Sequence, residues 1–184
     1  MNDDVGYRVL ELGANHIGEI AYTSRIALAD VAILNNAQEA HLSGFGGLAG
    51  VVKAKGEIIS GLSEQGQVVL NLDDPHVHEW QILAQPRRVW SFSLSNKEAS
   101  VYASDIQRTA KGSRFVLHLG QQHRHVDVLL LGQHNVANAL AAAAGALALG
   151  LSLDQIALGL GQVRPYHGRL ESHTLSNNRC VIDD

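Results

Sequence analysis

The sequence has 184 residues, of which 46% are hydrophobic and 17% are charged, and its formal net charge is -4. These values are ordinary for a soluble globular domain, and they exclude a basic nucleic-acid-binding surface and a long charged tail. Cys180 is the only cysteine, so an internal disulfide is excluded and we expect a reducing, cytoplasmic compartment. The longest apolar run, residues 136–149, is shorter than the roughly 18 residues of a membrane helix and predicts a buried helix.

The first half of the chain alternates predicted strands with predicted helices. We expect strands at 5–12, 31–34, 67–72 and 88–93, and helices at 18–28, 48–62 and 76–84. Nearly continuous apolar strands that alternate with helices are typical of a parallel sheet covered on both faces. The sequence therefore predicts an α/β fold with an open, mostly parallel sheet.

Residues 100–131 have a different pattern. Apolar and polar residues alternate around turn signals at Lys111–Gly112 and Gly120–Gln121, which predicts a small, half-exposed antiparallel β subdomain. Its three histidines are expected to be solvated rather than to bind metal, because no carboxylate stands at ligand spacing in their strand; they are His118, His123 and His125.

The chain returns to helix after this subdomain. We expect an alanine-rich helix with Asn135 as its N-cap and Gly150 just after its last residue. Ser152 is the predicted N-cap of a second helix over 153–160, and a last strand is predicted at 179–182.

Polar side chains follow three of the predicted strands. They are Glu11, Asn35 and Asn36, and Asn71, Asp73 and Asp74. In open α/β sheets, ligands bind beyond the carboxyl ends of the strands, so we expect these groups to converge on one edge, with His41 close by.

Lys55 stands out within the helix predicted at 48–62. It falls near the middle of an apolar stripe made of Leu48, Val51, Val52, Ile58, Ile59 and Leu62. A buried ammonium group costs free energy unless something compensates it. Two interpretations stay open: the stem packs in the core while the amine reaches solvent, or the lysine is modified or paired at a site.

The glycine-rich segment before this helix also has two interpretations. Gly44, Gly46 and Ala49 match the G-x-G-x-x-A pattern of dinucleotide-binding proteins, but no acidic residue follows at the required distance. A tight turn that begins a helix explains the same residues. No G-x-x-x-x-G-K-[ST] motif, and therefore no P-loop, occurs in the sequence.

Five strings occur in an order and at distances that resemble the central ATP-binding domain of the Mur ligases. They are ELGANHIGEI at 11–20, the segment from NNAQEAHLSGFGG to AKGEI at 35–58, LNLDDP at 70–75, GQHNVANALAAAA at 132–144 and GRLE at 168–171. The resemblance implies a P-loop NTPase-like α/β domain. It also implies an ATP- and Mg²⁺-dependent ligase that makes an amide through an acyl phosphate. The ANHIGEI and AHLSGFG strings point to UDP-N-acetylmuramoyl-tripeptide and D-alanyl-D-alanine as its small-molecule substrates.

The resemblance assigns roles to residues near the predicted edge of the sheet. Glu11 and His41 match metal ligands of the family, and Lys55 matches a lysine that the family carries as a carbamate. A carbamate supplies the anionic oxygen that an ammonium group lacks, which suits Mg²⁺. Asn15 and His16 are expected to contact the muramoyl-peptide substrate.

On the nucleotide side, the resemblance assigns His134, Asn135 and Asn138 to the adenine. Amide side chains both donate and accept hydrogen bonds, as a purine edge requires. Arg169 matches a catalytic arginine that reaches the γ-phosphate, and Asp184 matches an aspartate near the ribose.

The chain departs from the family pattern at both ends. We expect residues 1–168 to form the central domain without its P-loop, and residues 169–184 to lead toward a further domain. Such a polypeptide is expected to be inactive by itself. Two rival hypotheses are a non-catalytic α/β binding module and a nicotinamide-dependent oxidoreductase.

Overall fold

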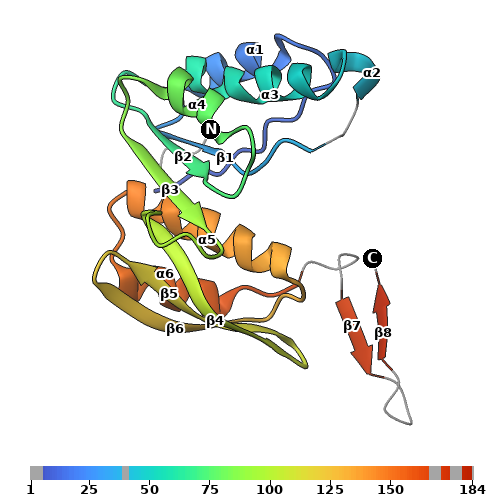
Figure 1. Ribbon diagram of the computed structural model, residues 1–184, viewed down its shortest axis with the longest axis vertical. Helices are drawn as coiled ribbons and strands as arrows, with labels where there is room; N and C mark the ends of the chain where they lie inside the picture. The colour runs from blue at the N-terminus through green and yellow to red at the C-terminus, as the bar shows by residue number, and fades with distance from the viewer. Residues whose placement is uncertain (1–5, 39–41, 166–170, 175–179, 184) are drawn as a thin grey trace.

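A six-stranded sheet forms the centre of the molecule (Figure 1). The computed structural model describes residues 6–38, 42–165, 171–174 and 180–183. The strands lie in sequential order and are β1 (Val31–Leu34), β2 (Gln67–Asn71), β3 (Val89–Ser93), β4 (Val101–Thr109), β5 (Gly112–Leu119) and β6 (Gln122–Val128). Strands β1 to β4 are parallel, whereas β4, β5 and β6 are antiparallel. The predicted α/β class is confirmed, and the antiparallel strands extend the parallel sheet through β3 and β4.

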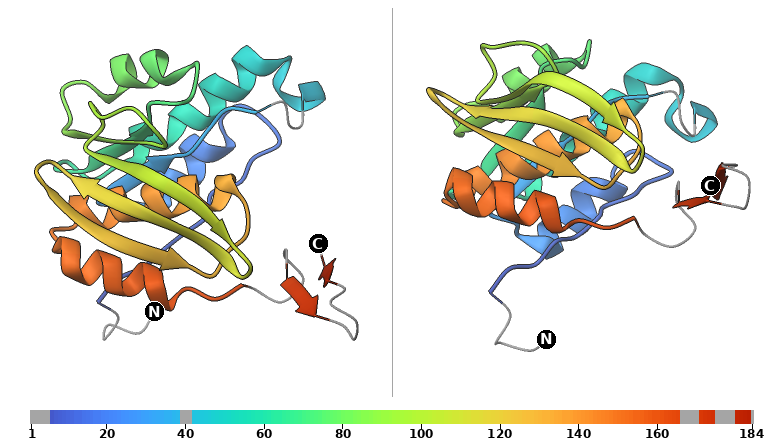
Figure 2. Two further views of the ribbon diagram at one scale, coloured as in Figure 1. Left: turned by 60° about the horizontal axis from the view of Figure 1, so that its bottom comes forward. Right: turned by 90° about the horizontal axis from the view of Figure 1, so that it is seen from below.

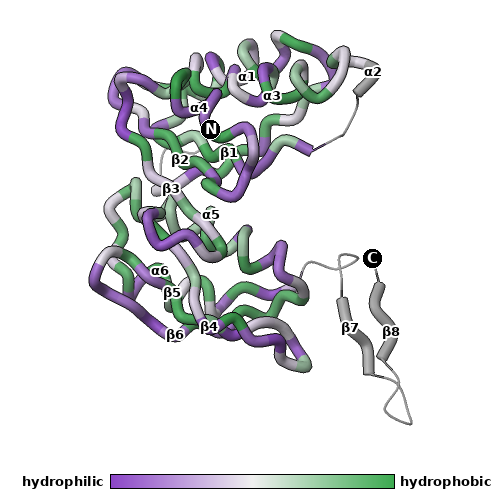
Figure 3. Tube along the Cα trace, viewed as in Figure 1, coloured by the Kyte–Doolittle hydropathy of each residue, from purple (hydrophilic) through white to green (hydrophobic). Residues whose placement is uncertain are grey.

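Helices cover both faces of the sheet at β1 and β2, as the sequence predicts for the parallel strands. The helical segments are α1 (Glu19–Ala27), α2 (Leu42–Phe45), α3 (Leu48–Gly56), the 3₁₀ segment η1 (Glu57–Gly61), α4 (Val77–Ala84), α5 (Gln133–Ala148) and α6 (Leu153–Gln162). Residues of α3, η1 and α4 share one hydrophobic cluster with β1 and β2, and residues of α5 and α6 share another with β2 to β6. Figure 3 shows that β1 and β2 are largely hydrophobic and end in hydrophilic residues.

Strand β2 contributes to both clusters because successive side chains of a strand point to opposite faces. Val68 and Leu70 pack with Trp80 of α4, whereas Val69 packs with Leu140 of α5. All of these side chains are 0% exposed. This central strand therefore joins the two clusters into one core.

The ends of the last two helices correct one prediction and confirm two. Gly132, with φ of 92°, is the N-cap of α5, so the prediction that Asn135 caps this helix is wrong. Asn135 lies in the first turn instead, where its side chain donates to the carbonyl of Leu131 at 2.7 Å. Gly150 ends α5 with φ of 85°, and Ser152 caps α6 through a reciprocal capping box, as predicted.

The strand predicted at residues 5–12 is wrong for the part that the structure describes. Residues 7–14 have no regular secondary structure, and Val9 is 98% exposed. No described strand pairs with this segment, and a strand needs a neighbour to bond its backbone amides. Apolar composition alone does not supply that neighbour.

Two further segments differ from the prediction. The helix expected over residues 48–62 becomes a 3₁₀ turn at Glu57, and residues 171–174 form an unpredicted strand, β7. That strand pairs with β8 (Cys180–Asp183), which matches the predicted last strand within one residue. No described helix is long and apolar enough to span a membrane.

Candidate functional site

Polar groups at the carboxyl ends of β1, β2 and β3 meet at one edge of the sheet. The amide of Asn71 donates to the carbonyl of Asn35 at 2.8 Å, and Asp74 accepts from the backbone N–H of Ala37 at 2.7 Å. Asp73 accepts from the backbone N–H of Leu94 at 2.7 Å. The predicted convergence is confirmed for the tips of β1 and β2. Asp73 and Asp74 use their oxygens to hold the loops that leave the sheet.

The loop before α1, residues 15–18, is held by two carboxylates. Glu19 accepts from the backbone N–H groups of Asn15 at 2.8 Å and His16 at 3.3 Å, and its other oxygen lies 3.0 Å from Nδ1 of His16. The hydrogen bond from Asn15 is the main reason that the pKa of Glu19 lies below its usual value, and the His16 side chain adds to the effect.

Glu57 holds the same loop from a distant part of the sequence. Its two oxygens accept from the N–H of Gly18 at 2.8 and 2.9 Å, and one of them accepts from Ala21 at 3.1 Å. Gly18 is the N-cap of α1 and has no side chain to cap the helix. Glu57 therefore caps α1 and ties it to the end of the helix that carries Lys55.

The glycine-rich segment lies against the same loop. A Cβ atom on Gly44 would lie 2.2 Å from the backbone oxygen of Asn15, so only glycine permits this approach. Gly46 and Gly47 have φ of 70° and 111° and connect α2 to α3. The tight-turn interpretation of this segment is confirmed, and the strings 11–20 and 35–58 meet in space.

Glu19 and Glu57 were not identified as site residues from the sequence. An acidic residue in the first turn of a predicted helix is a typical capping signal, and it would have found Glu19. No local signal identifies Glu57, because its partner Gly18 is 39 residues away.

Lys55 is half-buried, whereas its neighbours Val52, Ala54 and Gly56 are buried. The expected position at the centre of a buried stripe is therefore corrected. The 3.6-residue period ends at Gly56 and the next turn has about three residues. Ile59 still shares a buried hydrophobic cluster with Val52, whereas the side chain of Lys55 is only partly covered. The amine of Lys55 has no hydrogen bond or ion pair within the described residues.

The predicted metal ligands are only partly visible. The side chain of Glu11 is exposed, and His41 lies outside the described residues. Within the described ranges, no three His, Cys, Asp or Glu side chains are close enough to hold a metal ion. The set of Glu11, His41 and Lys55 stays a prediction.

The residues predicted to contact adenine lie together in the first turns of α5. The amide nitrogen of Asn135 lies 3.2 Å from Nε2 of His134, and the amide of Asn138 donates to the oxygen of Asn135 at 3.3 Å. His134 and Asn138 are exposed. Arg169 and Asp184 lie outside the described side chains, so the structure does not place them.

Residues 1–146 match the Mur ligase middle domain. The chain belongs to the Mur ligase family. The UDP-N-acetylmuramoyl-tripeptide–D-alanyl-D-alanine ligase of Escherichia coli is 42% identical over 184 residues, which is 100% of this chain and 41% of that protein.

Solved structures of other Mur ligases have the same fold. MurF from Acinetobacter baumannii superposes with a TM-score of 0.93 at 38% identity, over 100% of this chain and 40% of that one. The MurF ligase from Thermotoga maritima in complex with ADP is similar in fold, with a TM-score of 0.82 at 23% identity over 97% of this chain and 42% of that one. This Mur ligase chain thus spans about two fifths of the length of these relatives.

Proposed function

We propose that this chain is the nucleotide-binding part of an ATP-dependent ligase that joins D-alanyl-D-alanine to UDP-N-acetylmuramoyl-tripeptide. The observation that carries the proposal is the 42% identity to such a ligase over all 184 residues. The ligase forms an acyl phosphate on the tripeptide and then an amide with the dipeptide. It serves peptidoglycan precursor synthesis in the cytoplasm.

The first turns of α5 fit an adenine ring. Asn135 is fixed by its bond to Leu131, and it orients Asn138 through their shared hydrogen bond. The amide oxygen of Asn138 and the exposed ring of His134 face no described partner other than Asn135, so they are available to a purine edge. Arg169 and Asp184 are proposed to contact the γ-phosphate and the ribose.

Two members of the donor set proposed for Mg²⁺, Glu11 and carbamylated Lys55, offer the oxygen ligands that this ion prefers. Glu11 is exposed, and Lys55 is a half-buried residue whose amine has no described partner. Carbamylation would convert this amine into an anionic ligand, and His41 would complete the set. When bound, Mg²⁺ neutralises phosphate charge during phosphoryl transfer.

The loop that precedes α1 is proposed to contact the muramoyl-peptide substrate. Asn15 and His16 are exposed, while Glu19 and Glu57 fix the backbone around them. Gly44 brings this loop against α2, which leads through Gly46 and Gly47 into the helix with Lys55. Residues 1–168 form the proposed central domain, and residues 169–184 the proposed connection to another.

A titration of the 184-residue chain with ADP, followed by NMR, tests the adenine site. We expect weak binding, because the sequence has no P-loop motif to hold the phosphates. Asn138→Ala should weaken it about fivefold to tenfold, the effect of one lost hydrogen bond. The matched control is Gln133→Ala, in the same exposed turn. Equal binding by both variants would favour the non-catalytic module.

A further inference from the structure

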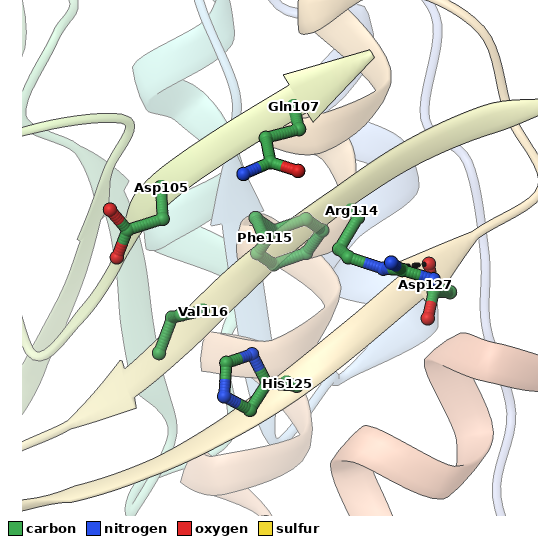
Figure 4. A pocket seen from close by; sticks show the side chains of 7 residues that line it. All are labelled: Asp105, Gln107, Arg114, Phe115, Val116, His125 and Asp127. Carbon is green, nitrogen blue, oxygen red and sulfur yellow. Dashed lines mark hydrogen bonds and ion pairs between the residues drawn. The ribbon is translucent and has the colours of Figure 1, made fainter. Parts of the chain in front are cut away.

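The outer face of strands β4 to β6 carries a hollow of about 500 Å³. Figure 2 shows α5 and α6 on the opposite side of these strands. The charged side chains that line the hollow already have partners. Arg114 bonds Asp127 at 2.8 Å (Figure 4), and the carboxylate of Asp105 lies 2.9 Å from the hydroxyl of Ser104. The first turn of α5, in contrast, holds polar atoms that no described residue occupies.

The ring of His134 folds back over the backbone of Gly132. A Cβ atom on Gly132 would lie 2.5 Å from Cε1 and 2.8 Å from Nδ1 of this ring. Real Cβ atoms essentially never come within 3.0 Å of another heavy atom, so a side chain at position 132 would displace the ring. Gly132 also has φ of 92° and ψ of 149°, a backbone conformation that essentially only glycine adopts. Both the backbone and the ring therefore require glycine here.

Asn135 fixes the proton on the same ring. Its amide nitrogen donates to the carbonyl of Leu131 at 2.7 Å and lies 3.2 Å from Nε2 of His134. An amide nitrogen is only a donor, so Nε2 accepts and the proton of the neutral ring is on Nδ1. Among the described residues none accepts from this Nδ1–H group, which lies on the edge of the ring next to Gly132. It is therefore available to a ligand.

We propose that Gly132 is a positioning residue of the adenine site. This inference rests on the nucleotide-binding function proposed for the turn. Adenine has ring nitrogens that accept hydrogen bonds, and the Nδ1–H group of His134 can donate to one of them. Glycine leaves this group uncovered and lets the ring reach Asn135. A methyl group at position 132 would push the ring away from Asn135 and cover Nδ1.

Gly150 provides a matched control at the other end of α5. It has φ of 85°, so an alanine there also meets backbone strain, but its Cβ atom would meet nothing within 4 Å. Both Gly132→Ala and Gly150→Ala should therefore lower the stability of the fold. Only Gly132→Ala should move the ring of His134.

NMR of the whole chain without ligand tests the position of the ring. We expect a nuclear Overhauser effect between Hε1 of His134 and an Hα of Gly132, because Cε1 lies against this backbone. In mildly alkaline buffer, where histidine rings are neutral, the ¹⁵N shifts of the ring should place the proton on Nδ1. Gly132→Ala should lose this tautomer preference and Gly150→Ala should keep it. Circular dichroism should verify that both variants are folded.

Titration with ADP tests the consequence for binding. Gly132→Ala should weaken ADP binding about fivefold to tenfold, the effect of one lost hydrogen bond, whereas Gly150→Ala should leave the affinity unchanged. When His134 is already replaced by alanine, Gly132→Ala should cause no further loss, because no ring remains to be displaced. This double-mutant cycle distinguishes positioning of the ring from a general effect on the helix.

Three outcomes would overturn the role of Gly132. They are a parent chain without the Overhauser effect, a folded Gly132→Ala variant that binds ADP as tightly as the parent chain, and an equal loss of affinity in Gly150→Ala. The last result would mean that backbone strain in α5, rather than the ring, weakens binding. The measurements without ligand test the ring whether or not ADP binds, so failure of this inference is separate from failure of the proposed function.

Discussion

At the scale of single residues, backbone amides and carboxylates decide how the loop before α1 is placed. The first N–H groups of a helix have no partner within the helix, and Gly18 offers no side chain to satisfy them. Glu57 supplies both carboxylate oxygens from the end of α3, while Glu19 satisfies the amides of Asn15 and His16. The loop is therefore anchored at both ends by negative charge near the positive end of a helix dipole.

Replacing Glu57 by glutamine should loosen this loop. The amide retains one oxygen acceptor but loses the charge, so we expect the free energy of unfolding to fall by about 1 kcal/mol. Hydrogen exchange at Gly18 and Ala21 should accelerate, as measured by NMR or mass spectrometry. Glu64→Gln is the control, because this exposed glutamate has no hydrogen bond among the described residues. Equal exchange in both variants would show that Glu57 does not hold the loop.

The anchor at Glu19 should depend on pH. Its pKa is lowered in the folded chain, first by the N–H of Asn15, so the folded state favours the carboxylate. The stabilisation is present above the usual value of 4.5 and is lost as the pH falls through the lower, folded value. The chemical shift of the Asn15 amide should therefore titrate with a midpoint below 4.5. A midpoint at or above that value would contradict the bonds described.

At the scale of elements, glycine permits α1 and η1 to pack closely. A Cβ atom on Gly61 would lie 2.3 Å from both the backbone carbon and the hydroxyl of Ser24, which is itself buried. Gly159, in contrast, is exposed on α6, and a Cβ atom there would meet nothing within 4 Å. The packing of α1 on η1 therefore requires glycine at position 61, whereas no contact requires glycine at position 159.

Alanine substitutions at these glycines should have opposite effects. Gly61→Ala should force α1 away from η1 and lower the free energy of unfolding by about 1–3 kcal/mol, the cost of overpacking. Gly159→Ala should raise it by about 0.5–1 kcal/mol, because alanine has the higher helix propensity. Urea denaturation measures both changes. A Gly61→Ala variant as stable as the parent chain would mean that α1 does not pack on η1 as described.

At the scale of the whole molecule, one sheet separates two hydrophobic clusters. Trp80 is buried in the cluster with α3 and α4, where its Nε1 donates to the carbonyl of Val52 at 3.0 Å. Trp90 packs against the cluster with α5 and bonds the side chain of Gln67 at 2.8 Å. Strand β2 carries residues of both clusters, with Val69 in one and Val68 and Leu70 in the other, so the two layers share one strand.

The two tryptophans should report a single unfolding transition. Trp90→Phe leaves Trp80 as the probe of one layer, and Trp80→Phe leaves Trp90 as the probe of the other. Within each variant, the urea midpoint from fluorescence should equal that from circular dichroism, because the shared strand β2 makes unfolding cooperative. Separate midpoints within one variant would mean that the layers unfold independently.

The sequence by itself determined the strand–helix alternation, the antiparallel half of the sheet and the N-cap of α6. These features depend on side-chain periodicity and on bonds between residues that are close in the chain, such as Ser152 and Gln155. The same local signals misplaced the N-cap of α5, because Gly132 and Asn135 are both common at helix ends.

Only the tertiary structure decided which segments have partners. Residues 7–14 are apolar enough for a strand but have no described neighbour, and Glu57 caps a helix that begins 38 residues earlier in the sequence. The ring of His118 likewise lies 2.9 Å from the hydroxyl of Ser104, which is in another strand. A hydrogen bond across such distances depends on where the chain brings its atoms, and no periodicity along the sequence encodes that position.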